Sequence, residues 1–319
     1  KEVTDMYRRP ETLEEIMKID SLKKVSLLGG GTDLVPLIKN GVKDCGSLID
    51  ITHIPEFRQI RKTENGWFIG ASVTLSSLSE NPDIGVLYPA LAKAAAKTAS
   101  PQIRSIGTIG GNILQDRRCM YFNQSAYWRS SLPLCYKTGG TICHQAPASP
   151  VCRAIYYSDT APALCVYHAK ALYYKGNLSK SLPVSDFIRQ HTVLNGTAEP
   201  EDILLEGFLL PFPEQNMKSD FEKISIRNSI DFPVVNFAGS FIPGTQKACL
   251  YAGAVAPFPV RLEKTEKALV SPHPDLNNLT ATAVEEIRSL SLLIKEPGIS
   301  PRIKRESFQN IRYLFQDLL

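Results

Sequence analysis

The sequence predicts an α+β protein with a small α/β unit, a mixed-sheet unit and a C-terminal antiparallel sheet with helices. Two short apolar runs flank a glycine loop near the start, an alanine-rich helical run lies at 90–97, and alternating apolar runs fill much of the last third. We expect domains at 1–55, 56–192 and 193–319, and the turn-rich stretch 195–200 marks the last boundary.

Composition and charge exclude several classes. Of the 319 residues, 43% are hydrophobic and 21% are charged, which is ordinary for a globular protein. The net charge of +4 and the lack of basic runs argue against nucleic-acid binding. No run reaches the roughly 18 apolar residues of a membrane helix, and no leader pattern opens the sequence. We therefore expect a cytoplasmic protein with no nucleic-acid or membrane partner.

The small α/β unit is predicted from the first 51 residues. A capping box at 12–15 begins a short helix, and strands are expected at 25–28 and 47–51. Between the strands, three glycines at 29–31 precede Thr32 and Asp33, and a helix is expected to follow. Glycines let backbone N–H groups approach a phosphate, but the loop matches neither the dinucleotide fingerprint nor the P-loop, so a plain tight turn is an equal alternative.

A second glycine loop follows the alanine-rich helix. A strand is expected at 67–71, the helix at 90–97 is stopped by Pro101, and Gly-Thr-Ile-Gly-Gly-Asn occupies 107–112. Two such loops could hold the two phosphates of a dinucleotide from different sides.

The segment 114–153 is polar and aromatic and has no clear helical or strand period. It holds four cysteines with 15, 7 and 8 residues between them, namely Cys119, Cys135, Cys143 and Cys152. A structureless stretch of this length is usually functional or disordered, and a bound metal or cluster would supply the missing order.

The spacing of these cysteines leaves the metal open. Zinc sites usually contain close ligand pairs, which are absent, and wide all-thiolate spacing suits an iron–sulfur cluster at least as well. His144 is interpreted as a bystander, and Arg117, Arg118 and Arg153 would offset the negative charge of a cluster. Four unrelated thiols are the alternative.

The other three of the seven cysteines give no metal signal, and an odd number in a long chain does not suggest a disulfide scaffold. Cys165 and Cys249 lie in apolar runs and are predicted to be core residues, whereas Cys45 lies by a turn.

The remaining elements are expected to be strands followed by two helices. Strands are predicted at 163–168, 171–175, 203–210, 221–227, 234–241 and 248–255, and helices from 185 and at 280–294 and 301–318.

Four motifs stand in an order that resembles the FAD-binding subunits of the molybdenum hydroxylases, the xanthine dehydrogenase family. They are Leu-Gly-Gly-Gly-Thr-Asp-Leu at 28–34, Thr-Ile-Gly-Gly-Asn at 108–112, Ser-Asp-Thr-Ala-Pro at 158–162, and Phe221, Lys223 and Arg227 before Asp-Phe-Pro at 231–233. The resemblance covers nearly the whole chain. It implies a two-subdomain PCMH-type FAD-binding domain, with the cysteine segment inserted at about 115–155.

The resemblance also implies a set of FAD-binding residues, none of them catalytic. These are Leu27, Leu28, Gly29, Gly30, Gly31, Thr32, Asp33, Leu34, Ile106, Gly107, Thr108, Gly111, Asn112, Gln115, Ser158, Asp159, Leu204 and Lys223. The first glycine loop would face the pyrophosphate and adenine, and Asp159 would bond the ribityl or ribose hydroxyls. Leu204 and Lys223 would lie near the adenine or isoalloxazine ring, although an alternating strand also allows a solvated Lys223.

The cysteine segment resembles the 4-hydroxybenzoyl-CoA reductase branch of this family, whose flavin subunit carries a [4Fe-4S] cluster besides FAD. The resemblance implies that Cys119, Cys135, Cys143 and Cys152 are cluster ligands. It further implies an oxidoreductase subunit that carries electrons, with reductive dehydroxylation of 4-hydroxybenzoyl-CoA or a related aromatic as the main hypothesis.

The implied partners are a large molybdopterin-binding subunit, a small [2Fe-2S] subunit, and ferredoxin or another low-potential carrier, in a dimer of heterotrimers. One alternative is the FAD subunit of a purine, N-heterocycle or aldehyde dehydrogenase of the same family. An alternative from another class is a zinc-stabilised binding module without a redox role.

Overall fold

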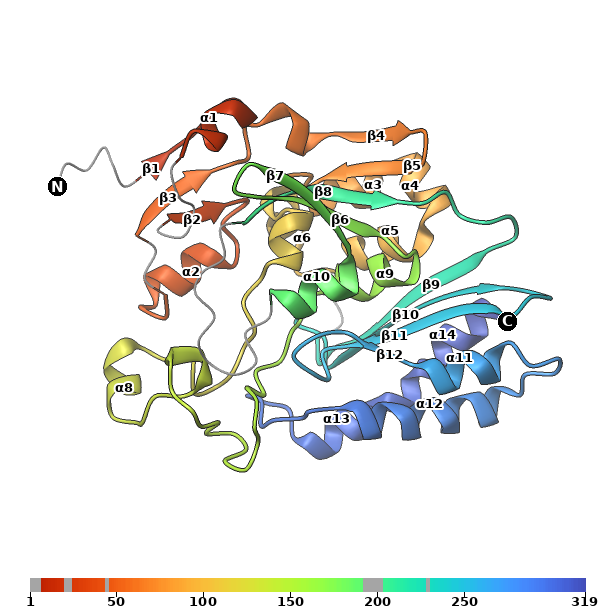
Figure 1. Cartoon of the computed structure of the whole chain (residues 1–319). Coiled ribbons are helices and arrows are strands. Elements are labelled where there is room, and N and C mark those ends of the chain that lie inside the picture. Colours follow the sequence, from red (N-terminus) through yellow and green to blue (C-terminus); the bar gives the residue numbers. More distant parts are fainter. Residues whose placement is uncertain (1–6, 20–24, 44–45, 192–202, 228–229) are drawn as a thin grey trace.

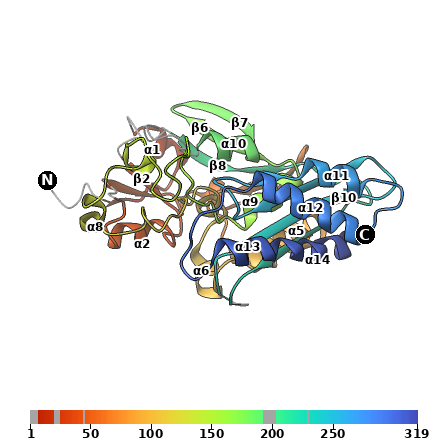
Figure 2. The ribbon, with the colours of Figure 1, turned by 90° about the horizontal axis from the view of Figure 1, so that it is seen from below.

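The computed structural model describes residues 7–19, 25–43, 46–191, 203–227 and 230–319. The described residues form three sheets with helices packed around them (Figure 1). The N-terminal sheet lies at one end of the molecule, and the C-terminal sheet with its helices lies at the other (Figure 2). The predicted α+β class is confirmed.

The N-terminal sheet is parallel and small. It contains β1 (Tyr7–Arg8), β2 (Val25–Leu28) and β3 (Ser47–Asp50) in the order β1-β3-β2. The helix α1 (Leu13–Met17) begins at Thr12, whose hydroxyl accepts a hydrogen bond from the Glu15 amide, and α2 (Leu34–Lys39) follows the first glycine loop. The loop therefore lies at the carboxyl end of β2, where parallel α/β sheets bind their ligands.

The middle sheet has five strands in the order β4-β5-β8-β6-β7. They are β4 (Ile60–Thr63), β5 (Gly66–Gly70), β6 (Lys170–Lys175), β7 (Leu178–Pro183) and β8 (Ile203–Leu210). A mixed sheet was expected here, but all four strand pairs are antiparallel. The strand β8 lies in the centre of this sheet, although the expected boundary near 193 assigns it to the C-terminal domain.

Short helices pack against the middle sheet and between it and the C-terminal sheet. They are the 3₁₀ helix η3 (Pro55–Arg58) and α3 (Leu75–Glu80), α4 (Pro82–Leu87), α5 (Pro89–Ala96), α6 (Pro101–Ile106), α7 (Ile109–Ile113), α9 (Thr160–Val166) and α10 (Val184–Gln190). The alanine-rich run forms α5 as predicted, and the small side chains of Ala90 and Ala94 on its packed face are fully buried.

One predicted strand is a helix. The run 163–168 was expected to be a strand, but its apolar residues belong to α9, every residue of which is buried. A short continuous apolar run fits a buried strand and a buried helix equally well, so its period cannot decide between them. Pro162 fits the first turn of α9, where its missing N–H costs nothing.

The C-terminal sheet is antiparallel in the order β12-β11-β10-β9. Its strands are β9 (Lys218–Ile224), β10 (Val235–Ile242), β11 (Lys247–Gly253) and β12 (Val260–Arg261). The helices α11 (Glu263–Leu269), α12 (Leu276–Leu290), α13 (Pro301–Ser307) and α14 (Ile311–Leu318), with the 3₁₀ helix η5 (Phe308–Asn310), pack beside it (Figure 1). The predicted helix 301–318 is therefore interrupted.

The cysteine segment is mostly irregular. It contains α8 (Ala126–Ser130) and the 3₁₀ helix η4 (Tyr136–Thr138), and it lies beside α2 in both views (Figure 1, Figure 2). Arg129 fixes this position, because its Nη2 donates to the carbonyls of Gly41 and Val42 at 3.2 Å each. In the part of the chain that the structure describes, no helix has the length and apolar character to cross a membrane.

Candidate functional site

The two glycine loops touch each other. A Cβ at Gly30 would lie 1.8 Å from the carbonyl oxygen of Ile106, and one at Gly29 would lie 2.7 Å from Thr108 Oγ1. Both positions therefore require glycine for close approach, to a backbone carbonyl at Gly30 and to a side-chain hydroxyl at Gly29, rather than for an unusual turn. The structure thus brings together, side against side, two loops that are about 75 residues apart in the sequence.

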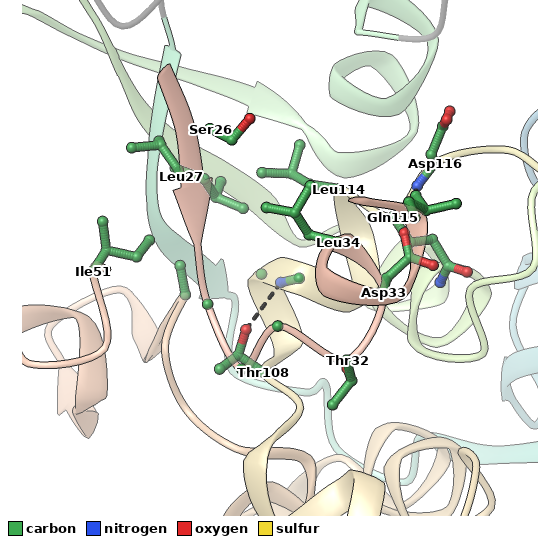
Figure 3. Close-up of a pocket in the computed structure, with 18 of the residues that line it drawn as sticks. Ser26, Leu27, Thr32, Asp33, Leu34, Ile51, Thr108, Leu114, Gln115 and Asp116 are labelled. Atoms are coloured by element: carbon green, nitrogen blue, oxygen red, sulfur yellow. Dashed lines mark hydrogen bonds between the residues drawn. The ribbon is translucent and has the colours of Figure 1, made fainter. Parts of the chain in front are cut away.

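The second loop is held by its threonine. The Thr108 hydroxyl caps α7 by accepting a hydrogen bond from the Gly111 amide at 3.1 Å, which is the dashed line in Figure 3. Gly110 packs against Ala71, whose carbonyl oxygen would lie 2.7 Å from a Cβ at position 110. The loop is therefore anchored to the middle sheet, and the first loop rests on it.

Two cavities lie at the paired loops. The first, of about 250 Å³, is lined by Ser26 and Leu27 from β2, Leu34 from α2 and Thr108 from the second loop (Figure 3). The second, of about 290 Å³, combines apolar and aromatic side chains with charged ones, namely Asp33, Arg118, Asp159, Arg227 and Asp231. The two share Thr32, Asp33, Thr108, Gly111 and Gln115. Each is smaller than an ordinary ligand site of about 300–1,000 Å³, but together they fall within that range.

Asp159 and Lys223 form a buried ion pair at the second cavity. Lys223 Nζ lies 2.8 Å from Asp159 Oδ2 and also donates to the Lys97 carbonyl at 2.9 Å. Asn236 Nδ2 donates to Asp159 Oδ1 at 2.7 Å. Burial raises the pKa of the Asp159 carboxyl, and the Lys223 ammonium opposes that shift. The alternative of a solvated Lys223 is wrong, because its side chain is 5% exposed.

Asn112 joins the second glycine loop to the Ser-Asp motif. Its Oδ1 accepts hydrogen bonds from Ser158 Oγ at 2.6 Å and from Thr160 Oγ1 at 2.7 Å. The Ser158 hydroxyl in turn accepts from the Ala161 amide at 3.1 Å, within the first turn of α9. These contacts hold the segment from which Asp159 lines the second cavity.

Most of the predicted site residues line one of these two cavities. The first cavity is lined by Leu27, Gly29, Gly30, Gly31, Thr32, Asp33, Leu34, Thr108, Gly111 and Gln115, and the second adds Gly107, Asn112 and Asp159.

Five predicted residues line neither cavity, namely Leu28, Ile106, Ser158, Leu204 and Lys223. Lys223 contacts Asp159, Ser158 contacts Asn112, and the backbone of Ile106 lies against Gly30. Leu204 is 1% exposed and packs in the N-terminal core with Ile16 and Ile49. Its neighbours Ile203 and Leu205 line the first cavity instead, because successive strand residues face opposite sides.

Sequence reasoning also missed several residues of the second cavity. Tyr157, Arg118 and Ala99 line it, and Phe232 lies against both Tyr157 and Arg118. Tyr157 directly precedes the Ser-Asp motif, and this adjacency was the only sequence feature that could have identified it as a cavity residue.

The four cysteines of the inserted segment line one small cavity of about 20 Å³. Burial raises the pKa of the Cys119 thiol, and Cys143 and Cys152 are each 6% exposed. The donor chemistry fits a metal, but the space suffices for about one water molecule. Among the described residues, no group of three or more His, Cys, Asp or Glu side chains stands where it could hold a metal ion.

The charges around the thiols differ from the expectation. Lys137 lines the cysteine cavity, where its buried ammonium donates to Asp116 at 2.5 Å and to the Arg117 carbonyl at 2.7 Å. Arg118 instead reaches Asp33, and Arg153 donates to Ser149 at 2.9 Å. Lys137, rather than Arg118 or Arg153, is therefore the cation that lines the cysteine cavity.

Two of the remaining cysteines are core residues. Cys165 and Cys249 are buried in the main core, as predicted. Cys45 lies outside the described residues. His144 Nε2 lies 2.8 Å from the Pro133 carbonyl oxygen.

The fold and the paired glycine loops define a flavin-binding oxidoreductase subunit. Residues 1–213 match the family described as the FAD binding domain in molybdopterin dehydrogenase, and the chain belongs to that family. It is an FAD-binding subunit of the molybdenum hydroxylase type, as the ordered motifs predicted.

Two relatives align over most of their length, and another aligns over a shorter stretch. The nicotinate dehydrogenase FAD-subunit of Eubacterium barkeri is 24% identical over 318 residues, covering 97% of this chain and 94% of that protein. The xanthine dehydrogenase FAD-binding subunit of Escherichia coli O157:H7 is 24% identical over 290 residues, covering 88% and 83%. The carbon monoxide dehydrogenase medium chain of Hydrogenophaga pseudoflava is 42% identical over 109 residues, covering 34% and 38%.

Solved structures share the whole fold. Carbon monoxide dehydrogenase from Hydrogenophaga pseudoflava gives a TM-score of 0.75 at 20% identity, covering 98% of this chain and 96% of that chain. Quinoline 2-oxidoreductase from Pseudomonas putida 86 gives a TM-score of 0.73 at 18% identity, covering 98% and 95%.

Proposed function

We propose that this chain is the flavin subunit of a molybdenum hydroxylase-type dehydrogenase complex and that FAD lies across both glycine loops. The observation that carries the proposal is the contact of Gly30 with the Ile106 carbonyl. It leaves two cavities that share residues of both glycine loops, which suits a dinucleotide whose diphosphate sits between its two ends. The family match supports the same cofactor.

The two ends of FAD can be assigned to the cavities from their linings. The flavin ring fits the second cavity, which has Leu75, Ile103 and Phe232 as apolar surfaces and Asp159 as a hydrogen-bond acceptor. The adenine end fits the first cavity, between the residues of β2 and Ile203. Lys223 and Asn236 would hold the Asp159 carboxylate in place for a ribityl hydroxyl. When bound, FAD supplies the exchange of electrons in pairs or singly.

The substrate belongs to partner subunits. The relatives carry names of nicotinate, xanthine and carbon monoxide dehydrogenases. We propose that this chain serves an oxidation of the same kind, on an N-heterocycle, purine or aldehyde, beside a large molybdopterin subunit and a small [2Fe-2S] subunit. These names support a dehydrogenase better than the reduction of 4-hydroxybenzoyl-CoA that the cysteine segment suggested.

The second candidate is the reductive function, with a [4Fe-4S] cluster bound by the inserted segment. It is favoured by one observation: Cys119, Cys135, Cys143 and Cys152 line the same cavity although the sequence spreads them over 34 residues. Against it stands the volume of about 20 Å³, so the loop would have to open around a cluster. Zinc in the same four thiols is the non-redox alternative.

One preparation tests these proposals. The full chain, purified anaerobically with the proteins that accompany it, is assayed for FAD, iron, acid-labile sulfide and zinc. Stoichiometric FAD supports the first proposal, and its absence from folded protein refutes it. Iron with sulfide supports the cluster, whereas zinc alone or no metal refutes it. Turnover with N-heterocycles or aldehydes, against 4-hydroxybenzoyl-CoA with a reduced donor, then distinguishes the two activities.

We also propose the domain division at 1–55, 56–192 and 193–319, with one revision. The pairing of β8 within the middle sheet supports moving the boundary between the second and third domains to follow Leu210. Limited proteolysis of the full chain tests it, because a fragment that begins after Leu210 is expected, whereas one beginning near residue 193 would restore the earlier boundary.

A further inference from the structure

Arg118 connects the cysteine segment to the proposed flavin site. It precedes Cys119 in the sequence, yet its side chain lines the second cavity. Its Nη2 donates to Asp33 Oδ1 at 2.5 Å, and its guanidinium carbon lies 4.5 Å from the centre of the Phe232 ring. One side chain thus contacts the first glycine loop and the 231–233 motif at once.

The backbone of Arg118 is held as firmly as its side chain. Its amide donates to the Ile155 carbonyl at 2.8 Å, and the Ile155 amide donates back at 2.9 Å. This pair joins the two ends of the cysteine segment, just before Tyr157 and Asp159. The guanidinium is therefore presented by a single antiparallel backbone bridge rather than by a free loop.

The charge of Asp33 explains why a cation is needed there. Asp33 lines both cavities, and a bare carboxylate at that position would repel a diphosphate. Its Oδ1 is paired with Arg118, and its Oδ2 accepts from the Asp116 amide at 3.2 Å. The two residues that donate hydrogen bonds to the Asp33 carboxylate both come from the start of the cysteine segment.

Arg118 has donor capacity left after this pairing. Its Nε is buried and has no hydrogen-bond partner among the described residues. Buried donors without partners are rare in folded proteins and costly to leave unsatisfied. Because the Arg118 side chain lines the second cavity, a small shift of the guanidinium would bring this donor to an acceptor on a ligand there.

We propose that Arg118 is a positioning residue for FAD. It belongs to the cysteine segment and acts at the flavin end of the site. It would donate from Nε to an oxygen of the bound flavin nucleotide and place a positive charge beside the ring. This inference rests on the proposed function. A nearby cation stabilises negative charge gained on reduction, so Arg118 would raise the flavin reduction potential.

The test compares three variants of the full chain by FAD affinity and flavin midpoint potential. Arg118→Met removes the charge, and we expect at least tenfold weaker FAD binding. We further expect the reduced flavin to lose tenfold more affinity than the oxidised flavin, which lowers a two-electron potential by about 30 mV. Arg118→Lys keeps the charge but not Nε, so it should retain the potential and lose affinity severalfold. Arg153→Met, in the same segment but outside both cavities, should change neither quantity.

The double variant Asp33→Asn/Arg118→Met separates a direct contact from simple charge compensation. If Arg118 contacts the flavin, the lowered potential persists after the Asp33 charge is removed. The inference would be overturned if the double variant recovered the wild-type FAD affinity and midpoint potential. It would also be overturned if Arg118→Met changed neither quantity. If Arg118→Met fails to fold, the Arg118→Lys result decides it, since an unchanged affinity there also overturns it. Failure of the wild-type chain to bind FAD would instead refute the proposed function.

Discussion

Lys223 Nζ lies 2.8 Å from Asp159 Oδ2, and the two side chains are only 5% and 3% exposed. Asp159 precedes α9, and Lys223 lies on β9, so the pair joins the helices around the middle sheet to the C-terminal sheet. A third polar group, Asn236 on β10, holds the second carboxylate oxygen. A buried charge must be paired to be tolerated, and these three residues therefore act as a unit.

Breaking that unit from one side should be costly. Lys223→Met leaves the Asp159 carboxylate buried beside no cation, and we expect the free energy of unfolding to fall by about 3–5 kcal/mol. Denaturant titration of flavin-free protein measures this. Adding Asp159→Asn should restore much of the loss, because a neutral amide no longer needs the ammonium.

An exposed ion pair provides the control for this prediction. Lys247 and Glu214 lie 2.6 Å apart, but their side chains are 61% and 53% exposed. Lys247→Met should cost about 1 kcal/mol or less. A similar loss in both single variants would show that burial of the Asp159–Lys223 pair has no energetic consequence.

The contact between the glycine loops should not tolerate a methyl group. In Gly30→Ala the new Cβ would meet the Ile106 carbonyl oxygen at 1.8 Å, so the loops must separate and the two cavities must change shape. We expect FAD affinity to fall at least tenfold. The measurement is flavin fluorescence during titration of the stripped chain.

Gly85→Ala is the matched control. Gly85 lies in α4, and no atom stands within 4 Å of the position of its Cβ. Alanine favours a helix over glycine by up to about 1 kcal/mol, so this variant should be slightly more stable and bind FAD normally. Normal FAD affinity in Gly30→Ala would contradict the assignment of the loops to the diphosphate.

The position of the cysteine cavity predicts that iron and flavin can be lost independently. If the cluster proposal holds, Cys135→Ser should lose iron and sulfide while keeping most of the flavin, because Cys135 lines the cysteine cavity and neither of the other two. Elemental analysis and the flavin absorbance measure the two losses independently. Cys249→Ala, in the core, should keep both.

Equal loss of iron and flavin in Cys135→Ser would show that the segment is part of the flavin scaffold. The Arg118–Asp33 bond is one contact through which such coupling would pass, and the bond from the Asp116 amide to Asp33 is another.

Tyr88 predicts a loss of stability at high pH. It is fully buried, donates to the Pro211 carbonyl at 2.9 Å, and has its pKa raised by burial from 10.0 to about 12. Between pH 10 and 12 the unfolded chain releases the Tyr88 proton and the native chain keeps it. The contribution of Tyr88 to the free energy of unfolding is therefore complete below pH 10 and is lost as the pH rises through 12. The loss should be on the order of 2 kcal/mol.

Tyr88→Phe isolates this contribution. Near neutral pH the variant should be less stable than wild type by about 1 kcal/mol, from the missing hydrogen bond. That difference should shrink or reverse by pH 12, as followed by denaturant titration. A difference that stays constant across the range would mean that Tyr88 titrates alike in both states.

Local sequence determined the parts of this protein whose geometry depends on neighbouring residues. The capping threonines, the glycine loops, the alanine-rich α5 and the strands of the C-terminal sheet all follow from near-neighbour chemistry and period, and the ordered motifs gave the family. Tertiary structure alone decided that 163–166 is helical, that Ile203 and Leu205 rather than Leu204 face a cavity, and that Arg118 reaches Asp33. The physical reason is that burial on one face, and the pairing of charges far apart in the sequence, depend on which distant segments pack there, and no local pattern encodes that choice.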